Sequence, residues 1–343
     1  MRYAISGGAG FLGLHLARRL LAEGHDVRSL DLVPLEGELA NAVEEIRGDV
    51  RDPARSEELC AGAEVLVHGA AALPIRGSEK EIRSVNVDGT ATLLAAALEA
   101  GLRRVILVST TAVYGVPETG GVREEAPLVG VGAYGRSKVE AEDVARAFGR
   151  RGLPLVILRP KTFLGPERLG VFEILFDWVR EGRRVYVLGD GSNHYQLLAV
   201  EDLVDAVVRS ANADGIEGDA LNLGATEFGT VREDLQALID HAQSASRLRP
   251  IPARPAEVVL RALELLRLSP LVEWHYRTAH HDSVVDVSKA ERRLGWKPRL
   301  SNAEALIRSY DWYLANREHL AADGITHRVP WSQKALGLLR RLS

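Results

Sequence analysis

A tyrosine and a lysine four residues apart are the pair in this chain best suited to proton transfer. Tyr134 and Lys138 open a helical pattern over 134–151, so they are neighbours on one helix face. A free tyrosine has a pKa of about 10 and is a poor base at neutral pH, but a close ammonium group favours the phenolate. Lowering that pKa by ~3 units corresponds to about 4 kcal/mol of differential stabilisation. We therefore expect Tyr134 to take a proton from a substrate hydroxyl while a hydride leaves the same carbon.

Three hydroxyl side chains precede this pair. Ser109, Thr110 and Thr111 follow the apolar residues of a strand predicted over 104–109. The carboxyl ends of the strands are where a doubly wound sheet holds its ligands, so one of these hydroxyls is expected to hold the substrate oxygen. Tyr-x-x-x-Lys pairs also occur on solvated helices. The catalytic interpretation therefore depends on this cluster and on a glycine motif near the start of the chain.

That motif is typical of a dinucleotide site. A short apolar strand over 2–6 runs into Gly7-Gly8-Ala9-Gly10-Phe11-Leu12-Gly13, and a helical pattern follows over 11–23. Glycines without Cβ atoms let the backbone approach a pyrophosphate, and the N-terminus of the helix favours its negative charge. The alternative is a strained structural turn. The order of strand, turn and helix favours the dinucleotide.

An acidic residue indicates which dinucleotide is bound. Asp31 ends a strand predicted over 26–31 and lies 18 residues past Gly13, close to the expected offset of about 20. A carboxylate there accepts hydrogen bonds from ribose hydroxyls and repels a 2′-phosphate. Arg28 is expected on the opposite face of the strand, and no basic residue occurs over 32–35. These observations favour NAD over NADP, although Asp31 could also be a solvated loop residue.

Further residues at predicted strand ends are expected to line the cofactor. Asp49 could accept a hydrogen bond from the adenine amino group beside the N–H of Val50, or it could cap the helix that follows. The small residues Ala70 and Ala71 would let the cofactor lie against the backbone. Asn86 lies on an otherwise apolar helix face, and a buried asparagine needs partners, so it is expected to tie down neighbouring strand ends.

The order of the predicted elements favours an α/β fold, a Rossmann-type doubly wound parallel sheet with a smaller C-terminal substrate lobe. We expect an NAD-binding Rossmann domain over 1–160 with its sheet completed by later segments, a substrate-binding lobe over 161–320 and a C-terminal tail over 321–343. The predicted strands are 2–6, 26–31, 43–48, 64–69, 104–109, 154–159, 184–188 and 219–223. The predicted helices are 11–23, 53–60, 79–100, 134–151, 171–181, 201–213, 230–243, 256–268 and 302–316.

Composition narrows the function classes. The formal net charge of −4 gives no reason to expect a nucleic-acid partner. The single cysteine, Cys60, cannot form an internal disulfide or a multi-cysteine metal cluster, and no metal site is expected. No uncharged run reaches the roughly 18–20 apolar residues that cross a bilayer, and a strand beginning at residue 2 leaves no room for a signal peptide. We therefore expect a cytoplasmic protein.

Taken in order, the motifs resemble those of extended short-chain dehydrogenases/reductases of the NAD-dependent epimerase/dehydratase family. The segments that carry the resemblance, over about residues 1–316, are SGGAGFLG, GDVRD, HGAA, NVDGT, STTAVYG, YGRSK, LRPKTFLGP, GDGSNHYQLLAVEDLVDAV and SKAERRLGWKP. The resemblance implies that Thr110 is the catalytic hydroxyl, Tyr134 the base and Lys138 its partner. It also implies a homodimer packed through the helices near 88–100 and 134–151. With Ala71, Ser109, Tyr134 and Lys138, the expected cofactor contacts are Gly7, Gly10, Phe11, Leu12, Asp31, Asp49, Val50, Ala70, Asn86 and Pro160.

Departures from the family pattern bear on the reaction and the substrate. Nucleotide-sugar dehydratases of the family carry an Asp-Glu pair where this chain has Thr111 and Ala112, so dehydration is disfavoured. Thr162 stands where epimerases commonly have asparagine, and Tyr195 where they carry an arginine for the substrate phosphates. With Thr111, the expected substrate residues are Lys161, Thr162, Tyr195 and Arg277. Lys161 and Arg277 neutralise a diphosphate, or else the substrate is less charged.

A second resemblance supports the less charged substrate. RPKTFLGP and GDGSNHYQ are also similar to segments of 3β-hydroxysteroid-dehydrogenase-like members, and the apolar segment 255–271 could wall a lipophilic pocket or be an ordinary lid or core helix. A helical stripe over 331–342 is expected to pack on the protein itself, with weak membrane-surface or partner contact as the alternative. The resulting hypothesis is epimerisation of a nucleotide sugar. The alternatives are a net NAD(H)-dependent dehydrogenase or reductase of a sterol-like alcohol or ketone and, with less support, an NAD-sensing regulator.

Overall fold

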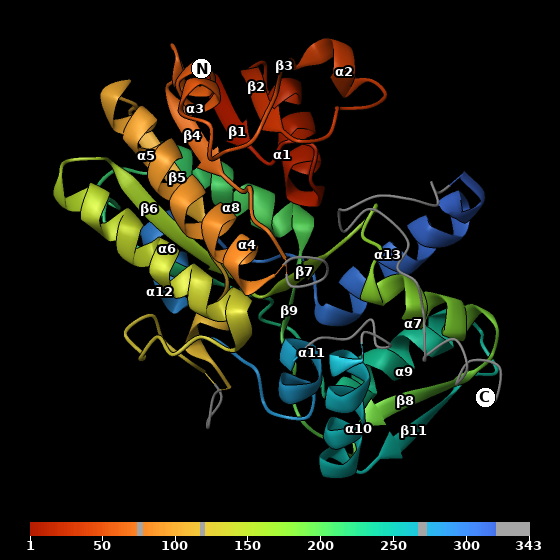
Figure 1. Ribbon diagram of the computed structural model, residues 1–343. Coiled ribbons are helices and arrows are strands. Elements are labelled where there is room, and N and C mark those ends of the chain that lie inside the picture. Colours follow the sequence, from red (N-terminus) through yellow and green to blue (C-terminus); the bar gives the residue numbers. More distant parts are fainter. Residues whose placement is uncertain (74–77, 117–120, 267–272, 320–343) are drawn as a thin grey trace.

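A seven-stranded parallel sheet forms the centre of the computed structural model, which describes residues 1–73, 78–116, 121–266 and 273–319 (Figure 1). The strand order is β10-β6-β5-β4-β1-β2-β3, so the chain winds outward from β1 in both directions. This confirms the predicted Rossmann-type doubly wound sheet. The strands are β1 (Arg2–Ser6), β2 (Asp26–Asp31), β3 (Glu44–Arg47), β4 (Val65–His68), β5 (Arg104–Val108), β6 (Leu155–Pro160) and β10 (Ala220–Leu223).

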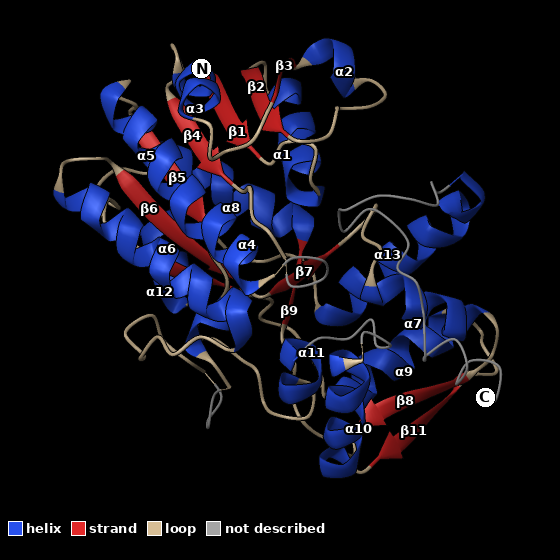
Figure 2. Ribbon diagram, in the orientation of Figure 1, coloured by secondary structure: helices blue, strands red, loops and turns tan. Residues whose placement is uncertain are grey.

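Helices cover both faces of this sheet (Figure 2). Side chains alternate along each strand, so Tyr3 and Ile5 of β1 pack into one apolar core and Ala4 into another. The first core includes α1 (Phe11–Ala22) and α8 (Val200–Asn212), with α12 (Ser288–Leu294) beside them. The second includes α3 (Pro53–Cys60), α5 (Gly89–Glu99) and α6 (Gly132–Arg150). Because both faces of the sheet are buried, the central strands β4, β5 and β6 are almost continuously apolar.

The second half of the chain builds a lobe below the carboxyl ends of the strands, toward the lower right of Figure 1. Aromatic residues of α7 and α13, among them Phe176 and Tyr310, form a separate core there. A short two-stranded sheet of β7 and β9 lies between the large sheet and the lobe. The elements are β7 (Thr162–Leu164), α7 (Val171–Arg180), β8 (Arg184–Leu188), β9 (Leu197–Ala199), α9 (Val231–His241), β11 (Arg247–Ile251), α10 (Ala253–Leu265), α11 (Glu273–Thr278) and α13 (Asn302–Asn316).

The element boundaries differ from the predicted ones where short or irregular segments occur. The helix predicted over 79–100 is divided into α4 (Glu79–Arg83), a π-helical turn (Ser84–Asp88) and α5. Strands β7, β9 and β11 and the short helices α2 (Leu39–Ala42), α11 and α12 are not among the predicted elements. Three-residue strands show too little alternation to be recognised. The tail helix predicted over 331–342 lies outside the described residues.

Among the residues that the structure describes, no helix is both long enough and apolar enough to cross a bilayer.

Candidate active site

A cavity of about 790 Å³ lies where the carboxyl ends of the strands face the lobe. The glycine turn, the ends of β2, β4, β5 and β6, and helices α7 and α9 all contribute to its wall. Ligands of doubly wound sheets bind at this end, near the strand from which the order runs in both directions. The cavity therefore coincides with the position predicted for the site.

The glycine turn leaves no room for side chains. Gly7 has a φ of +77°, in the left-handed region, and a Cβ atom on it would lie 2.8 Å from the amide nitrogen of Ala70. A Cβ atom on Gly13 would lie 2.4 Å from the carbonyl oxygen of Gly7. No side chain caps α1 at Gly10, and the residues of its first turn line the cavity. This arrangement fits the pyrophosphate of a dinucleotide, because backbone and N-terminal charge can meet the anion directly.

Asp31 lies at the same end of the cavity, at the end of β2. Its Oδ2 accepts a hydrogen bond from the N–H of Ala9 at 3.0 Å, and its Oδ1 accepts one from the N–H of Val33 at 3.1 Å. Burial raises the pKa of this carboxyl, and these N–H groups oppose the rise. Arg28 points away, as predicted, because its guanidinium donates to the backbone carbonyl oxygens of Glu58 and Ala61. The carboxylate is therefore fixed at the cavity wall, where the ribose of a dinucleotide would lie.

A basic residue that the local sequence does not reveal lies close to this carboxylate. Arg47 of β3 pairs in register with Asp31, and its guanidinium donates to the carbonyl oxygen of Leu32 at 2.5 Å. The prediction of a preference for NAD considered basic residues only over 32–35, where none occurs. It missed Arg47 because neighbouring strands of a parallel sheet bring distant residues together.

Asp49 and Asn86 hold two of the loops that border the cavity. Both carboxylate oxygens of Asp49 accept hydrogen bonds from Arg51, at 2.9 and 2.5 Å, and these bonds lower the pKa of Asp49. Asp52, and not Asp49, caps α3, so the alternative role considered for Asp49 is wrong. Asn86 exchanges two hydrogen bonds with the backbone of Ala72, at 2.7 and 3.1 Å. It thereby fixes the chain that leaves β4.

The residues predicted to move protons come together beside the cavity. Tyr134 lies in the first turn of α6, and the side chain of Thr110 is close enough to its hydroxyl to favour the phenolate. Lys138 follows one turn later, and its Nζ donates to the carbonyl oxygen of Val108 at 3.0 Å. Ser109 and Thr110 directly follow β5, and Thr110 has an extended backbone, so α6 and β5 together position this group.

Burial dominates the ionisation of the tyrosine and the lysine. It raises the pKa of Tyr134 to about 12, while the positive charge of Arg168 and the side chain of Thr110 act in the opposite direction. Burial lowers the pKa of Lys138 to about 8, and the negative charge of Glu142 opposes that change. The prediction that Lys138 lowers the pKa of Tyr134 is therefore wrong for this arrangement. Desolvation outweighs the neighbouring charges, and the cation that acts on Tyr134 is Arg168.

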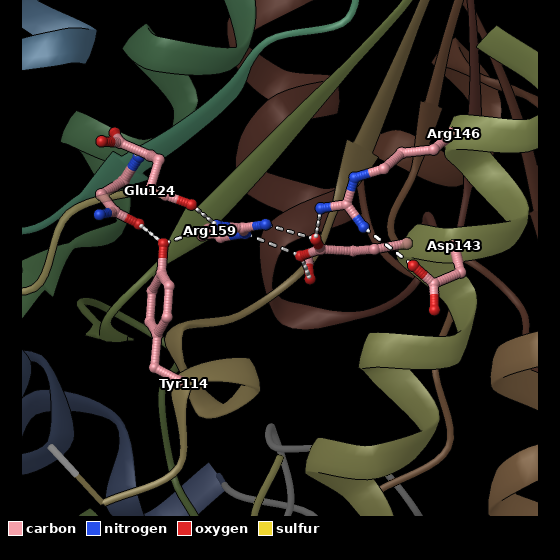
Figure 3. A network of polar contacts seen from close by, with 8 residues as sticks. Tyr114, Glu124, Asp143, Arg146 and Arg159 are labelled. Carbon is pink, nitrogen blue, oxygen red and sulfur yellow. Dashed lines mark hydrogen bonds and ion pairs between the residues drawn. The ribbon is translucent and has the colours of Figure 1, made fainter. Parts of the chain in front are cut away.

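The ionic network drawn in Figure 3 is buried between α6 and β6, and its carboxylate engages the hydroxyl of Ser109. This hydroxyl donates to Oε1 of Glu142 at 2.6 Å. Arg159 of β6 donates to both oxygens of the same carboxylate, at 2.9 and 2.7 Å, and to the hydroxyl of Tyr114 at 2.7 Å. Arg146, on the solvent side of α6, also donates to Glu142 at 2.6 Å. Of the three hydroxyl side chains that follow β5, those of Thr110 and Thr111 are therefore the ones available to a ligand in the cavity.

Three of the predicted substrate residues meet on the lobe side of the cavity. The Nζ of Lys161 donates to Oγ of Ser283 at 2.5 Å and lies 4.9 Å from the ring centre of Tyr195. The hydroxyls of Thr162 and Tyr195 are 3.5 Å apart. Arg277 is placed differently, since it pairs with Glu273 at 2.9 Å, half its side chain is exposed, and it is not among the residues that line the cavity.

Two features were missed or misjudged from the sequence. Arg168, which lines the cavity between β7 and α7, received no prediction, because an isolated arginine in a loop has no local signal of burial. The apolar segment 255–271 was considered as a possible pocket wall. Within its described part, no residue of α10 lines the cavity, and Val258 and Val259 are 71% and 56% exposed.

Comparison with known proteins identifies the family. The profile described as "NAD dependent epimerase/dehydratase family" matches residues 3–224. The chain belongs to this family. A curated relative, uncharacterized protein y4nG of Sinorhizobium fredii, is 36% identical over 98% of this chain and 84% of its own length.

Relatives of this family member with named activities are more distant. UDP-glucose 4-epimerase of Mycolicibacterium smegmatis is 29% identical over 91% of this chain and 98% of its own length. The dTDP-glucose 4,6-dehydratase of Streptomyces niveus is 28% identical, covering 92% and 94%, and 3β-hydroxysteroid-dehydrogenase/decarboxylase isoform 1 of Arabidopsis thaliana is 28% identical, covering 97% and 84%. The solved UDP-glucose 4-epimerase of Thermotoga maritima has the same fold, with a TM-score of 0.78 over 92% of this chain and all of that one at 22% identity.

The family and the cavity agree on the cofactor. Members are NAD-dependent, and solved neighbours include complexes with NAD. The crowded glycine turn and the fixed carboxylate of Asp31 are the features that such a cofactor requires. The protein is an NAD-dependent enzyme of the epimerase/dehydratase family.

Proposed function

We propose that this enzyme is an epimerase that oxidises a secondary alcohol carbon of a nucleotide sugar and then returns the hydride to the opposite face. The observation that carries the proposal is the meeting of Thr110, Tyr134 and Lys138 at the cavity that the dinucleotide turn also lines. A base, a hydroxyl and a cation around one cavity are the groups that reversible alcohol oxidation needs.

Each residue has a distinct role in this proposal. Bound NAD supplies the hydride acceptor. The Tyr134 phenol oxygen, as phenolate, takes the proton of the substrate hydroxyl, and Thr110 holds the same substrate oxygen by a hydrogen bond. The Nζ of Lys138, anchored on the carbonyl oxygen of Val108, contributes positive charge to this region. In the return direction, Tyr134 gives the proton back to the substrate oxygen.

Dehydration is disfavoured within this proposal, although one relative is a dehydratase. Loss of water needs a general acid and a general base beside the reacting carbons. Thr111 and Ala112 follow the catalytic hydroxyl, and neither side chain can serve as that acid or base at neutral pH.

A second candidate is supported by the character of the cavity wall. Phe11, Phe163, Phe172 and several leucines line it, which suits a hydrophobic alcohol or ketone. The steroid dehydrogenase relative favours the same candidate. The enzyme would then catalyse net oxidation or reduction, and one equivalent of nicotinamide would change its redox state per turnover.

One experiment separates the two candidates. The purified protein with bound NAD is incubated with UDP-glucose, and the sugar products are analysed while absorbance is followed at the reduced-nicotinamide band. Epimerisation forms a second UDP-hexose with no net change in absorbance. Stoichiometric accumulation of reduced nicotinamide with a hydrophobic alcohol, and no conversion of UDP-sugars, would instead support the dehydrogenase.

A further inference from the structure

Arg168 is a buried cation that the proposed catalytic roles leave without a task. Its side chain lies in the loop between β7 and α7 and is only 8% exposed. Its Nε has no hydrogen-bond partner, and no acidic side chain among the described residues forms an ion pair with it. Arginine keeps its proton in proteins, so this is a desolvated positive charge at the cavity wall.

Aromatic rings hold the guanidinium in place. Its central carbon lies 5.3 Å from the ring centre of Phe11 and 5.6 Å from that of Phe163. These two rings are stacked on each other, 5.7 Å apart and within 9° of parallel. Such contacts fix the plane of a guanidinium while leaving its N–H donors free for a ligand.

The backbone beside Arg168 is also constrained. Glu167 has a φ of +70°, which a residue with a side chain adopts only when the surroundings require it. Its carboxylate is hydrogen-bonded to Arg18 of α1, and the carbonyl oxygen of Pro166 is hydrogen-bonded to His15 of the same helix. The loop is therefore tied to α1 through the two residues that immediately precede Arg168.

A second buried cation lines the same cavity. Lys161 is 3% exposed, and burial is the only influence that shifts its pKa, to about 7. No carboxylate therefore compensates the charge of its ammonium group. The hydroxyl of Ser283 and the face of Tyr195 are its neighbours.

Arg168 keeps its positive charge, and a bound anion would favour the charged form of Lys161, so the cavity wall is receptive to an anion. A charge removed from water is destabilising unless an opposite charge or several hydrogen bonds replace the lost hydration. A planar guanidinium offers two parallel N–H donors, the geometry that matches a carboxylate. The positive charge of Arg168 acts on the hydroxyl of Tyr134. An anion bound by Arg168 would therefore lie close to the substrate carbon that reacts.

We propose that Arg168, with Lys161, binds a carboxylate carried by the same sugar unit that Tyr134 deprotonates, so that the preferred substrates are acidic nucleotide sugars. This inference rests on the proposed function. It adds a specificity-determining pair that distinguishes an acidic sugar from its neutral counterpart.

A second anion could also bind Arg168, namely the diphosphate of the cofactor. Phe11 belongs to the glycine turn, so Arg168 also lies on the cofactor side of the cavity. The N-terminus of α1 already provides for the cofactor diphosphate, which is why we assign Arg168 to the substrate. Titration with NAD distinguishes these two anions.

The test is calorimetric titration of the full chain saturated with NAD, using two matched pairs of probes. The first pair is UDP-glucuronate and UDP-glucose, and the second is free glucuronate and free glucose at millimolar concentration. The variants are Arg168→Gln, which removes the charge, and Arg168→Lys, which keeps the charge but loses the two parallel N–H donors of the guanidinium. Arg249→Gln is the control, because Arg249 is exposed on β11 in the same lobe.

The wild-type chain and R249Q are expected to bind UDP-glucuronate at least about 10-fold more tightly than UDP-glucose. R168Q should reduce this preference to about 2-fold or less, and R168K should retain only part of it. Both variants should bind UDP-glucose and NAD with affinities within about 2-fold of those of the wild-type chain.

Several results would overturn the proposal. A wild-type chain that binds both UDP-sugars equally contradicts it while leaving the proposed epimerase intact. Weaker NAD binding by R168Q, with the preference for the acid unchanged, assigns the guanidinium to the cofactor. If neither UDP-sugar binds but glucuronate is preferred over glucose in an Arg168-dependent way, the carboxylate site stands and the nucleotide-sugar function fails. If glucuronate too shows no such preference, both fail.

Discussion

Tyr134 and Lys138 illustrate how burial and charge compete at a single site. Burial raises the pKa of the phenol to about 12 and lowers that of the ammonium group to about 8. Both shifts disfavour the charged forms, so each charge depends on its neighbours. Thr110 and Arg168 favour the phenolate, while Glu142 favours the ammonium ion.

Replacing the base tests the proposed chemistry directly. Tyr134→Phe removes only a hydroxyl, so turnover should fall by about 10²- to 10⁴-fold, the range typical of a general base. Affinity for NAD should change little, because the hydroxyl moves a proton and is not a main anchor of the cofactor. Product formation and NAD binding are measured on the same preparation, and unaltered turnover would show that another group is the base.

Asp31 offers a test of cofactor preference. Asp31→Ala should weaken NAD binding by about 10- to 100-fold, because hydrogen bonds to a charged group are lost. NADP binding should weaken less or improve, since the repulsion of its 2′-phosphate disappears while Arg47 remains nearby. Fluorescence titration with both cofactors measures the ratio. Asp26→Ala, at the exposed opposite end of β2, is the control and should not alter it.

Lys161 links stability to pH. Its pKa of about 7 in the folded protein is below the ordinary lysine value, so the unfolded chain binds more protons between these two values. The resulting destabilisation is absent above the unfolded pKa, grows as the pH falls, and is complete below about 7. Lys161→Met should therefore stabilise the protein by about 1–4 kcal/mol at pH 6 and have little effect at pH 10.

Urea denaturation at both pH values measures this difference. Lys80→Met serves as the control, because Lys80 is exposed in α4 and should show no such pH dependence. Equal effects of Lys161→Met at the two pH values would indicate that packing, and not charge, is responsible.

At the scale of elements, the proton-transfer group depends on how α6 is held against β5 and β6. Glu142 of α6 and Arg159 of β6 are almost completely buried, and their side chains form two hydrogen bonds (Figure 3). Although burial alone would lower it, the hydrogen bonds and charge of Glu142 raise the pKa of Arg159. This ion pair joins the helix that carries Tyr134 to the sheet.

Breaking the pair should be costly. Arg159→Met leaves Glu142 buried with only Arg146 and Ser109 as partners, so we expect a loss of about 3–5 kcal/mol in the free energy of unfolding. Arg150→Met, an exposed change at the end of the same helix, should be nearly neutral. Urea denaturation of both variants measures the difference. A loss below 1 kcal/mol for Arg159→Met would show that the pair is not needed to hold α6.

Elements with local sequence signals were predictable from the sequence, and elements defined by distant partners were not. The bounds of β1, β2, α3 and α13 match the predicted ranges, because their apolar period, caps or flanking turns are local signals. Strands β7 and β9 exist only because they pair with each other. The π-helical turn at Ser84–Asp88 interrupts a continuous helical pattern, and the pattern itself contains no sign of it.

At the scale of the whole molecule, the cavity joins residues from both halves of the chain. The glycine turn was recognisable because all its residues are consecutive. Arg168 was not, because its burial results from packing against the stacked rings of Phe11 and Phe163, which come from distant parts of the chain. The placement of Arg277 outside the cavity wall likewise depends on how α11 packs. Local motifs therefore predicted the cofactor, while substrate recognition depends on tertiary contacts.

Cofactor binding should stabilise the entire molecule. A ligand that binds only the folded state at 100 times its Kd adds about 2.7 kcal/mol to the free energy of unfolding. NAD should therefore raise the melting temperature in a concentration-dependent way, and NADP at equal concentration should raise it less. Differential scanning fluorimetry of the full chain measures both. Equal shifts with the two cofactors would contradict the role given to Asp31.

The position of β10 in the sheet leaves one strand edge exposed while the protein is being synthesised. This strand pairs with β6, yet 59 residues, 161–219, separate them in the sequence. Until residue 223 has left the ribosome, the outer edge of β6 has unpaired N–H and C=O groups that can recruit a strand from another nascent chain. A fragment ending at residue 160 keeps that open edge permanently. Aggregation of such fragments, and protection of this edge by chaperones during synthesis, follow from the same topology.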